Sequence, residues 1–136
     1  MTQNQPEGYL TTPSTGTGPG VLVLHAWWGL NETIKATCNR LAETGFVTFA
    51  PDLYHSKVAD TIPDAEALGK ALDANYLQAR AEITQAASYL SESVGRAGGG
   101  LAVMGFSLGA FYALDLAAQD PEHIRAVVLF YGTGGV

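Results

Sequence analysis

The sequence has 136 residues, of which 47% are hydrophobic and 16 are glycine, and this composition suits one compact domain of helices and strands. Thirteen acidic residues against seven basic ones give a net charge of -6, which argues against nucleic acid and anionic membranes as partners. The single cysteine, Cys38, excludes a disulfide within the chain. No stretch reads as a signal peptide or a membrane span, so we expect a cytoplasmic protein.

Two parts of unequal size are expected. Residues 1–20 are polar and rich in Thr, Gly and Pro, which favours a flexible lead-in with room for one short strand at Tyr9–Thr12. Residues 21–136 should form the domain. This domain begins with Val21–His25, a continuous apolar run typical of a strand buried on both faces of a parallel sheet.

Helices alternate with strands through the rest of the chain. Asn31 is a candidate N-cap and Gly45 a stop signal for the first helix. The further predicted elements are a strand at Phe46–Ala50 ended by Pro51, helices at Asp64–Leu72 and Asp73–Val94, a strand at Leu101–Met104, a helix at Leu108–Ala118 and a strand at Ala126–Phe130. This alternation predicts an α/β fold with a mostly parallel sheet. Ligands of such sheets bind at the carboxyl ends of the strands, where the loops beginning at His25, Pro51, Gly105 and Tyr131 should converge.

The segment Gly105-Phe-Ser107-Leu-Gly109 matches Gly-x-Ser-x-Gly, the nucleophile elbow that presents a serine between a strand and a helix. An apolar strand pattern precedes it and a helical pattern follows, so we predict Ser107 as a nucleophile. The backbone N–H groups of Leu108, at the helix start, and of Trp27 are the predicted oxyanion donors. The alternative is a tight turn that needs small residues only for packing.

None of the three histidines is an adequate base for Ser107. His123, preceded by Asp120, follows the serine in the expected order, but the intervening helix of about ten residues carries the chain roughly 15 Å away, to the opposite end of the sheet. His25 is expected to order the oxyanion loop through a hydrogen bond. His55 faces either the pocket or solvent, and Asp52 is expected to brace its own loop.

These segments together resemble the dienelactone hydrolase family of α/β-hydrolases, from Val21 onward. The resemblance rests on the run Val21–Asn31, on Ala50-Pro-Asp-Leu-Tyr54, on the elbow and on Phe130-Tyr-Gly132. It implies a three-layer fold and hydrolysis of lactones or carboxylic esters without a cofactor or metal. It also implies Ser107 as nucleophile and the N–H groups of Trp27 and Leu108 as oxyanion donors.

The sequence departs from the family's best-known members at two linked positions and at its end. Those members carry a cysteine nucleophile and a glutamate in the oxyanion loop, whereas this chain has Ser107 and Ala26, which favours a more ordinary esterase. The family's Asp and His follow two further strands, so we expect an N-terminal portion that lacks the C-terminal strands, helices and catalytic partners.

An unpaired apolar edge at Ala126–Phe130 would then be an interface for a second chain. The alternative function is a non-catalytic module that binds a partner through this edge. A flavodoxin-like anion binder is a weaker reading, because no loop has a phosphate-cradling pattern.

Overall fold

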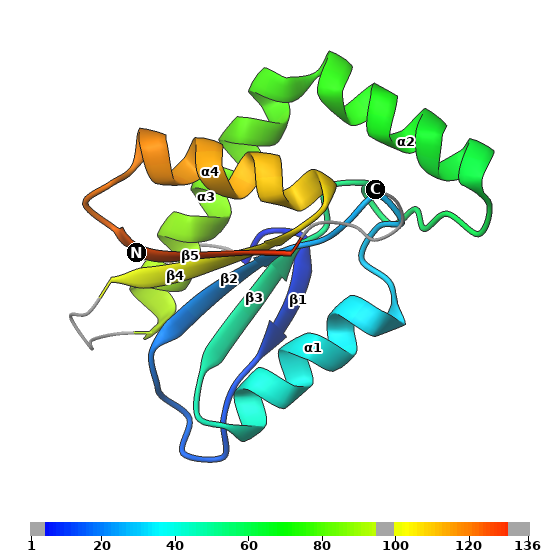
Figure 1. The fold of residues 1–136 in the computed structure, drawn as a ribbon. Helices are drawn as coiled ribbons and strands as arrows, with labels where there is room; N and C mark the ends of the chain where they lie inside the picture. The colour runs from blue at the N-terminus through cyan, green and yellow to red at the C-terminus, as the bar shows by residue number, and fades with distance from the viewer. Residues whose placement is uncertain (1–4, 95–99, 131–136) are drawn as a thin grey trace.

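The computed structural model describes residues 5–94 and 100–130. Five strands form one sheet in the order β1-β3-β2-β4-β5, in which β1 pairs antiparallel with β3 and the other neighbours are parallel (Figure 1). The strands are β1 Gly8–Thr11, β2 Gly20–Leu24, β3 Val47–Pro51, β4 Leu101–Phe106 and β5 Ile124–Phe130. The predicted α/β class and mostly parallel sheet are therefore confirmed.

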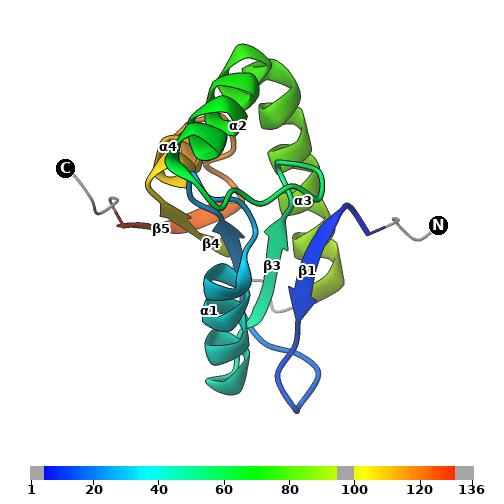
Figure 2. The same ribbon diagram turned by 90° about the vertical axis from the view of Figure 1, so that its right-hand side faces the viewer.

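Four helices cover the sheet: α1 Glu32–Glu43, α2 Ile62–Ala74, α3 Tyr76–Val94 and α4 Leu108–Gln119. Helix α1 lies on one face, while α3 and α4 lie on the other, so the fold has three layers (Figures 1 and 2). Helix α2 packs beside α3 above the carboxyl ends of the strands. Within residues 5–94 and 100–130, no helix has the length and apolar character needed to cross a membrane.

The helix starts follow from local capping. The Asn31 carboxamide accepts the Ile34 N–H at 3.1 Å, which confirms the predicted N-cap of α1, and the Thr61 hydroxyl caps α2 in the same way. The predicted break between Leu72 and Asp73 is wrong. Helix α2 continues to Ala74, because Asn75 ends it by donating from its side chain to Ala71 and then accepts the first N–H groups of α3.

The predicted strands are present with shifted ends. The short strand expected at Tyr9–Thr12 is β1, and its pairing with β3 makes it part of the sheet. Pro51 is the last residue of β3 rather than the residue that follows it. The strand predicted at Leu101–Met104 continues to Phe106, since β5 pairs with it along this whole length.

The two strands that flank β4 differ in burial. All five residues of β2 are buried, between one apolar cluster under α3 and α4 and another under α1. Strand β5 is buried only at Ile124, and Val128 and Phe130 remain 42% and 46% exposed. Helix α1 packs on β1 and β3, so the same face over β5 stays open in the described part of the chain.

Candidate active site

Ser107 lies at the carboxyl end of β4, in the turn that enters α4. Its backbone has φ 53° and ψ -110°, in the positive-φ region that non-glycine residues rarely adopt. Its N–H donates to the Phe130 carbonyl at 2.6 Å and so continues the ladder between β4 and β5. The Ser107 hydroxyl does not cap α4, although serine is a favoured capping residue. A strained turn therefore holds this side chain at the sheet edge where ligands of α/β proteins bind.

The two glycines of the motif make this turn sterically feasible. A Cβ atom at Gly105 would lie 2.4 Å from the Gly109 carbonyl oxygen, and one at Gly109 would lie 2.4 Å from the Leu24 carbonyl oxygen. Both contacts are with backbone, which cannot rotate away as a flexible side chain does. The start of α4 therefore packs directly against the end of β2, and Gly109 is needed for that approach.

The loop after β2 is held by the side chain of His25. The carbonyl oxygen of Ala26 lies 2.8 Å from His25 Nδ1 and also accepts the Gly29 N–H at 3.0 Å. The His25 Nε2 atom accepts the Leu53 N–H at 3.2 Å, so the ring proton is on Nδ1. The ordering hydrogen bond expected of His25 is thus present. Full burial lowers the pKa of His25 below its ordinary value, which keeps the ring neutral.

These bonds set the direction of the Trp27 N–H. In a trans peptide unit the C=O and the N–H point in opposite directions, and the described chain contains no cis peptide. Because the Ala26 carbonyl is held by His25 and Gly29, the Trp27 N–H points away from them. Since Leu24 pairs with Gly105, this loop leaves the sheet beside the Ser107 turn.

The other two histidines do not reach Ser107. His123 is 57% exposed and contacts Asp120 at 2.8 Å, and its carbonyl accepts the N–H of Leu101 at the beginning of β4, opposite the serine. His55 is half exposed, with its two ring nitrogens 2.9 Å from Glu7 and 3.3 Å from Glu82. It follows β3, two strands and about 10 Å from β4. Neither His55 nor His123 is therefore placed beside Ser107.

Asp52 behaves as expected for a loop brace. Its carboxylate accepts the N–H groups of Tyr54 at 3.2 Å and Ser56 at 2.7 Å. These bonds hold a loop in which both His55 and Ser56 have positive φ. The fourth predicted loop, which begins at Tyr131, lies outside the described residues.

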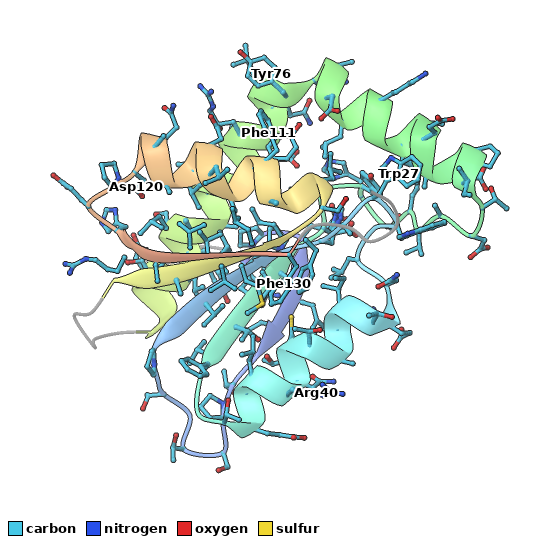
Figure 3. All side chains as sticks on the ribbon, in the orientation of Figure 1. Trp27, Arg40, Tyr76, Phe111, Asp120 and Phe130 are labelled. Carbon is cyan, nitrogen blue, oxygen red and sulfur yellow. The ribbon has the colours of Figure 1, made fainter. Side chains whose placement is uncertain are left out.

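An open hollow of about 540 Å³ begins beside Leu108, the residue after Ser107. Its other walls come from α3, α4 and the end of α2: Asp73, Tyr76, Arg80, Phe111 and Tyr112. Tyr76 and Phe111 are on the same side of α4 (Figure 3). Arg80 is paired with Asp115 through two contacts of 2.9 and 3.0 Å, whereas the Asp73 carboxylate accepts the neutral Tyr112 hydroxyl at 2.9 Å. The hollow is therefore aromatic, and among the described residues no ion pair compensates Asp73.

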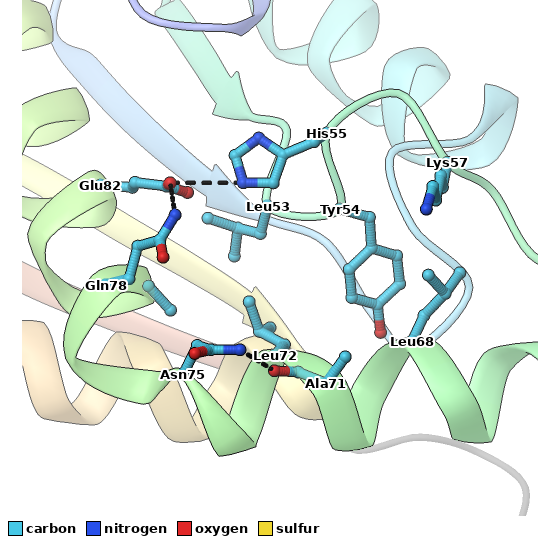
Figure 4. Close-up of a pocket in the computed structure, with 11 residues that line it drawn as sticks. Leu53, Tyr54, His55, Lys57, Leu68, Ala71, Leu72, Asn75, Gln78 and Glu82 are labelled. Atoms are coloured by element: carbon cyan, nitrogen blue, oxygen red, sulfur yellow. Dashed lines mark hydrogen bonds and ion pairs between the residues drawn. The ribbon is translucent and has the colours of Figure 1, made fainter.

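A second hollow, of about 230 Å³, lies between α2, α3 and the loop after β3 (Figure 4). Leu53, Leu68 and Leu72 form its apolar walls, and Glu82 at its rim is bonded to Gln78 and His55. Glu82, Gln78 and His55 thus bond to one another, and Ser107 is not among the walls of this hollow. Among the described residues, no group of three or more His, Cys, Asp or Glu side chains is placed to hold a metal ion.

The sequence alone does not assign a role to Tyr54. In the structure its hydroxyl donates to the Trp27 carbonyl at 2.9 Å. The Trp27 indole in turn packs against Gly69 of α2, where a Cβ atom would lie 2.8 Å from the ring. Trp27 and Tyr54 are 27 residues apart, and no periodicity or spacing in the sequence indicates this contact.

The sequence of this chain is similar to a known protein family and to several known proteins. The model of the dienelactone hydrolase family matches residues 7–135. The chain belongs to the dienelactone hydrolase family. Protein usf of Aquifex pyrophilus is 40% identical over 129 residues, covering 92% of this chain and 55% of that protein. The carboxymethylenebutenolidase of Pseudomonas sp. strain P51 is 31% identical over 133 residues, with 93% and 55% covered.

Solved structures of this family show the same fold. A dienelactone hydrolase-like promiscuous phosphotriesterase from metagenomic libraries has a TM-score of 0.77 and 25% identity, covering 90% of this chain and 52% of its own. The chain spans about half the length of the curated relatives it matches. The resemblance inferred from the sequence is thereby confirmed as family membership.

Proposed function

We propose that this chain carries the nucleophile and the oxyanion hole of a serine-dependent hydrolase of carboxylic esters or lactones. The observation that carries the proposal is the strained turn at Ser107, at the carboxyl ends of the strands. The Ser107 hydroxyl makes no capping hydrogen bond to α4. Strain of this kind persists only where the surrounding structure over-determines it, as Gly105 and Gly109 do here. Family membership supports hydrolysis as the class of reaction.

The chemistry assigned to each group follows from acyl transfer. The Ser107 Oγ attacks the carbonyl carbon while a base removes its proton, and the former carbonyl oxygen becomes an oxyanion. The N–H of Leu108, at the start of α4, and the N–H of Trp27 donate to that oxyanion, and the helix dipole adds to the stabilisation. The alcohol or enol then leaves with the proton, and water hydrolyses the acyl-enzyme by the same route.

The base and its orienting acid are proposed to come from polypeptide outside this sequence. Each of the three histidines has another position or partner, as described above. The relatives are nearly twice as long as the matched region, so their length leaves room for further catalytic residues. We place the reaction in the cytoplasm, where the buried Cys38 would stay reduced.

The hollow beside Leu108 is proposed to receive one side of the substrate. Its aromatic walls and the Asp73 carboxylate favour an uncharged aryl or alkyl group over an anionic one. Aryl esters should therefore be hydrolysed with lower KM than esters of dicarboxylic acids. Replacement of the exposed Phe111 by alanine should raise KM for aryl esters and leave short-chain esters unaffected.

Covalent labelling tests the proposal. The full-length protein should react with a fluorophosphonate, which bonds to Oγ and releases fluoride, and Ser107→Ala should abolish labelling. Ser88→Ala, at an exposed serine on α3, is the matched control and should label normally. Undiminished labelling of Ser107→Ala would sink the assignment.

The open edge of β5 supports a second candidate function, a module that binds another chain. An exposed apolar strand edge pairs readily with a further strand, and Val128 and Phe130 are the side chains left uncovered. We propose a second copy of the chain as the occupant. Light scattering should then show a dimer that Val128→Lys dissociates, and a monomer at high concentration would contradict this function.

A further inference from the structure

The oxyanion loop is tied to the loop after β3 by three hydrogen bonds from consecutive parts of that loop. The Leu53 N–H donates to His25 Nε2 at 3.2 Å, the Tyr54 hydroxyl to the Trp27 carbonyl at 2.9 Å, and the Ala59 N–H to the Trp28 carbonyl at 3.0 Å. The donors of two of these bonds are the backbone N–H groups of Leu53 and Ala59, so these donors do not depend on a side chain of the loop after β3. The bond from Tyr54 depends on one oxygen atom.

Tyr54 is built to keep this bond. Its side chain is 5% exposed, and its ring meets the edge of the His25 ring with centroids 4.8 Å apart. Burial raises the pKa of Tyr54 to about 12, so the phenol keeps its proton and remains a donor at neutral pH. The residue therefore contacts both the side chain that orients the Ala26 carbonyl and the carbonyl of Trp27 itself.

Trp27 is consequently held at three points. Its preceding peptide is oriented by His25 and Gly29, its own carbonyl by Tyr54, and its indole ring by Gly69 of α2. A donor that is aimed at a developing oxyanion contributes only within a narrow range of position, since a misplacement of about 1 Å costs on the order of 100-fold in rate. Loss of one of these restraints should therefore slow the chemical step and lower kcat.

We propose that Tyr54 is a positioning residue that aims the Trp27 N–H at the oxyanion, with Gly69 as the surface against which Trp27 is set. This inference rests on the proposed function. Tyr54 acts through Trp27 and is separated from Ser107 by that loop, so it takes no part in proton transfer. Trp27 also links α2 to the proposed oxyanion hole, because its indole ring contacts Gly69 of α2 and its backbone N–H is the proposed donor.

The experiment compares Tyr54→Phe with Thr48→Val in the full-length protein. Both substitutions remove a buried hydroxyl and keep the shape of the side chain, but Thr48 bonds to the Cys38 carbonyl on the α1 side of the sheet. Tyr54→Phe should lower kcat by about 10- to 100-fold and leave KM within about twofold. Thr48→Val should leave both constants unchanged at a similar loss of stability.

A tetrahedral analogue separates positioning from a loss of stability. A trifluoromethyl ketone forms an oxyanion at Ser107, so its inhibition constant should rise with Tyr54→Phe by the same factor by which kcat/KM falls. Gly69→Ala, which forces the indole to move, should produce the same parallel change. It provides an independent route if Tyr54→Phe does not fold.

Two results would overturn the inference. Equal effects of Tyr54→Phe and Thr48→Val on kcat would assign Tyr54 to stability alone. An unchanged inhibition constant in both Tyr54→Phe and Gly69→Ala would show that the Trp27 N–H is not the donor they position. Failure of the proposed function is distinguishable, because it would appear as fluorophosphonate labelling that survives Ser107→Ala.

Discussion

Strands β2 and β5 lie on either side of β4, the strand that leads into Ser107, and they differ in burial and in pairing. Strand β2 is buried along its whole length, and the loop that leaves it is fixed by hydrogen bonds from His25, Leu53 and Tyr54. Strand β5 pairs with β4 on one side and exposes Val128 and Phe130. The loop after β2 is thus fixed by contacts within the described residues, while the side of the candidate site over β5 is open in them.

This difference separates two requirements of acyl transfer. A donor to the oxyanion is a backbone N–H, and a local arrangement of turns and hydrogen bonds suffices to aim it. A base must approach the serine from another segment of chain, and the open side over β5 is where space for such a segment exists. The proposed oxyanion donors lie within the described residues, whereas the proposed base has to come from a separate segment of chain.

The largest expected effect is at the contact between α4 and β2. A methyl group at Gly109 would lie 2.4 and 2.7 Å from the carbonyl oxygens of Leu24 and His25, so Gly109→Ala must displace backbone. We expect a loss of about 3 kcal/mol in unfolding free energy, measured by denaturant titration. Gln119→Ala, at an exposed position of the same helix, should change it by less than about 0.5 kcal/mol. A neutral Gly109→Ala would show that the approach of α4 to β2 is looser than described.

The two hydrogen bonds of His25 can be separated by substitution. Asparagine places an amide near the Nδ1 position and keeps the bond to the Ala26 carbonyl. Glutamine instead reaches the Leu53 N–H and loses the bond to the Ala26 carbonyl. If the Ala26 carbonyl sets the direction of the Trp27 N–H, kcat should fall by about 100-fold in His25→Gln and by about 10-fold in His25→Asn. The reverse order would place the main effect on the Leu53 contact.

Stability should depend on pH through His25. Its pKa is lowered in the folded protein by burial, so the unfolded chain binds the proton more tightly. The stabilisation is complete above the unfolded pKa of about 6.5 and is lost as the pH falls from there towards the folded pKa, with a slope of about 1.4 kcal/mol per pH unit. Unfolding titrations at several pH values should show this decline in the wild type and not in His25→Asn.

His55 contributes in the opposite direction and is removed for that measurement. The hydrogen bond that His55 Nδ1 donates to the Glu7 carboxylate raises the pKa of His55. The small, solvent-screened contribution of His55 is therefore present below pH 6.5 and fades as the pH rises through the folded pKa. A His55→Gln background therefore isolates the effect of His25. Persistence of the acidic decline in His25→Asn in this background would assign it to other groups.

The smallest effect is expected on β5, where the same substitution can be made on both flanking strands. Val23→Thr places a hydroxyl in the fully buried centre of β2 and should cost about 1–3 kcal/mol. Val128→Thr, at a 42% exposed position of β5, should cost about 0.5 kcal/mol or less. Similar costs at both positions would mean that β5 is covered in the full-length protein.

Several features of this protein were readable from the sequence because they depend on neighbouring residues. The strand and helix alternation, the Asn31 cap and the elbow around Ser107 are set by apolar periodicity, capping chemistry and glycine spacing within about ten residues. The length of the helix after Ser107 was enough to predict that His123 is not the base for Ser107. The family was indicated separately, by the resemblance of these segments to the dienelactone hydrolase family.

Other features were decided by contacts between residues far apart in the chain. The end of α2 at Ala74 rather than Leu72 was missed because Asn75 bonds to both α2 and α3. The tautomer of His25 depends on the Leu53 N–H, 28 residues away, and the carbonyl of Trp27 is held by a hydroxyl 27 residues away. The periodic pattern of apolar residues does not indicate which residues so far apart will be in contact. The sequence alone therefore indicated the turn at Ser107, and only the packing of one loop on another determined the direction of the Trp27 N–H.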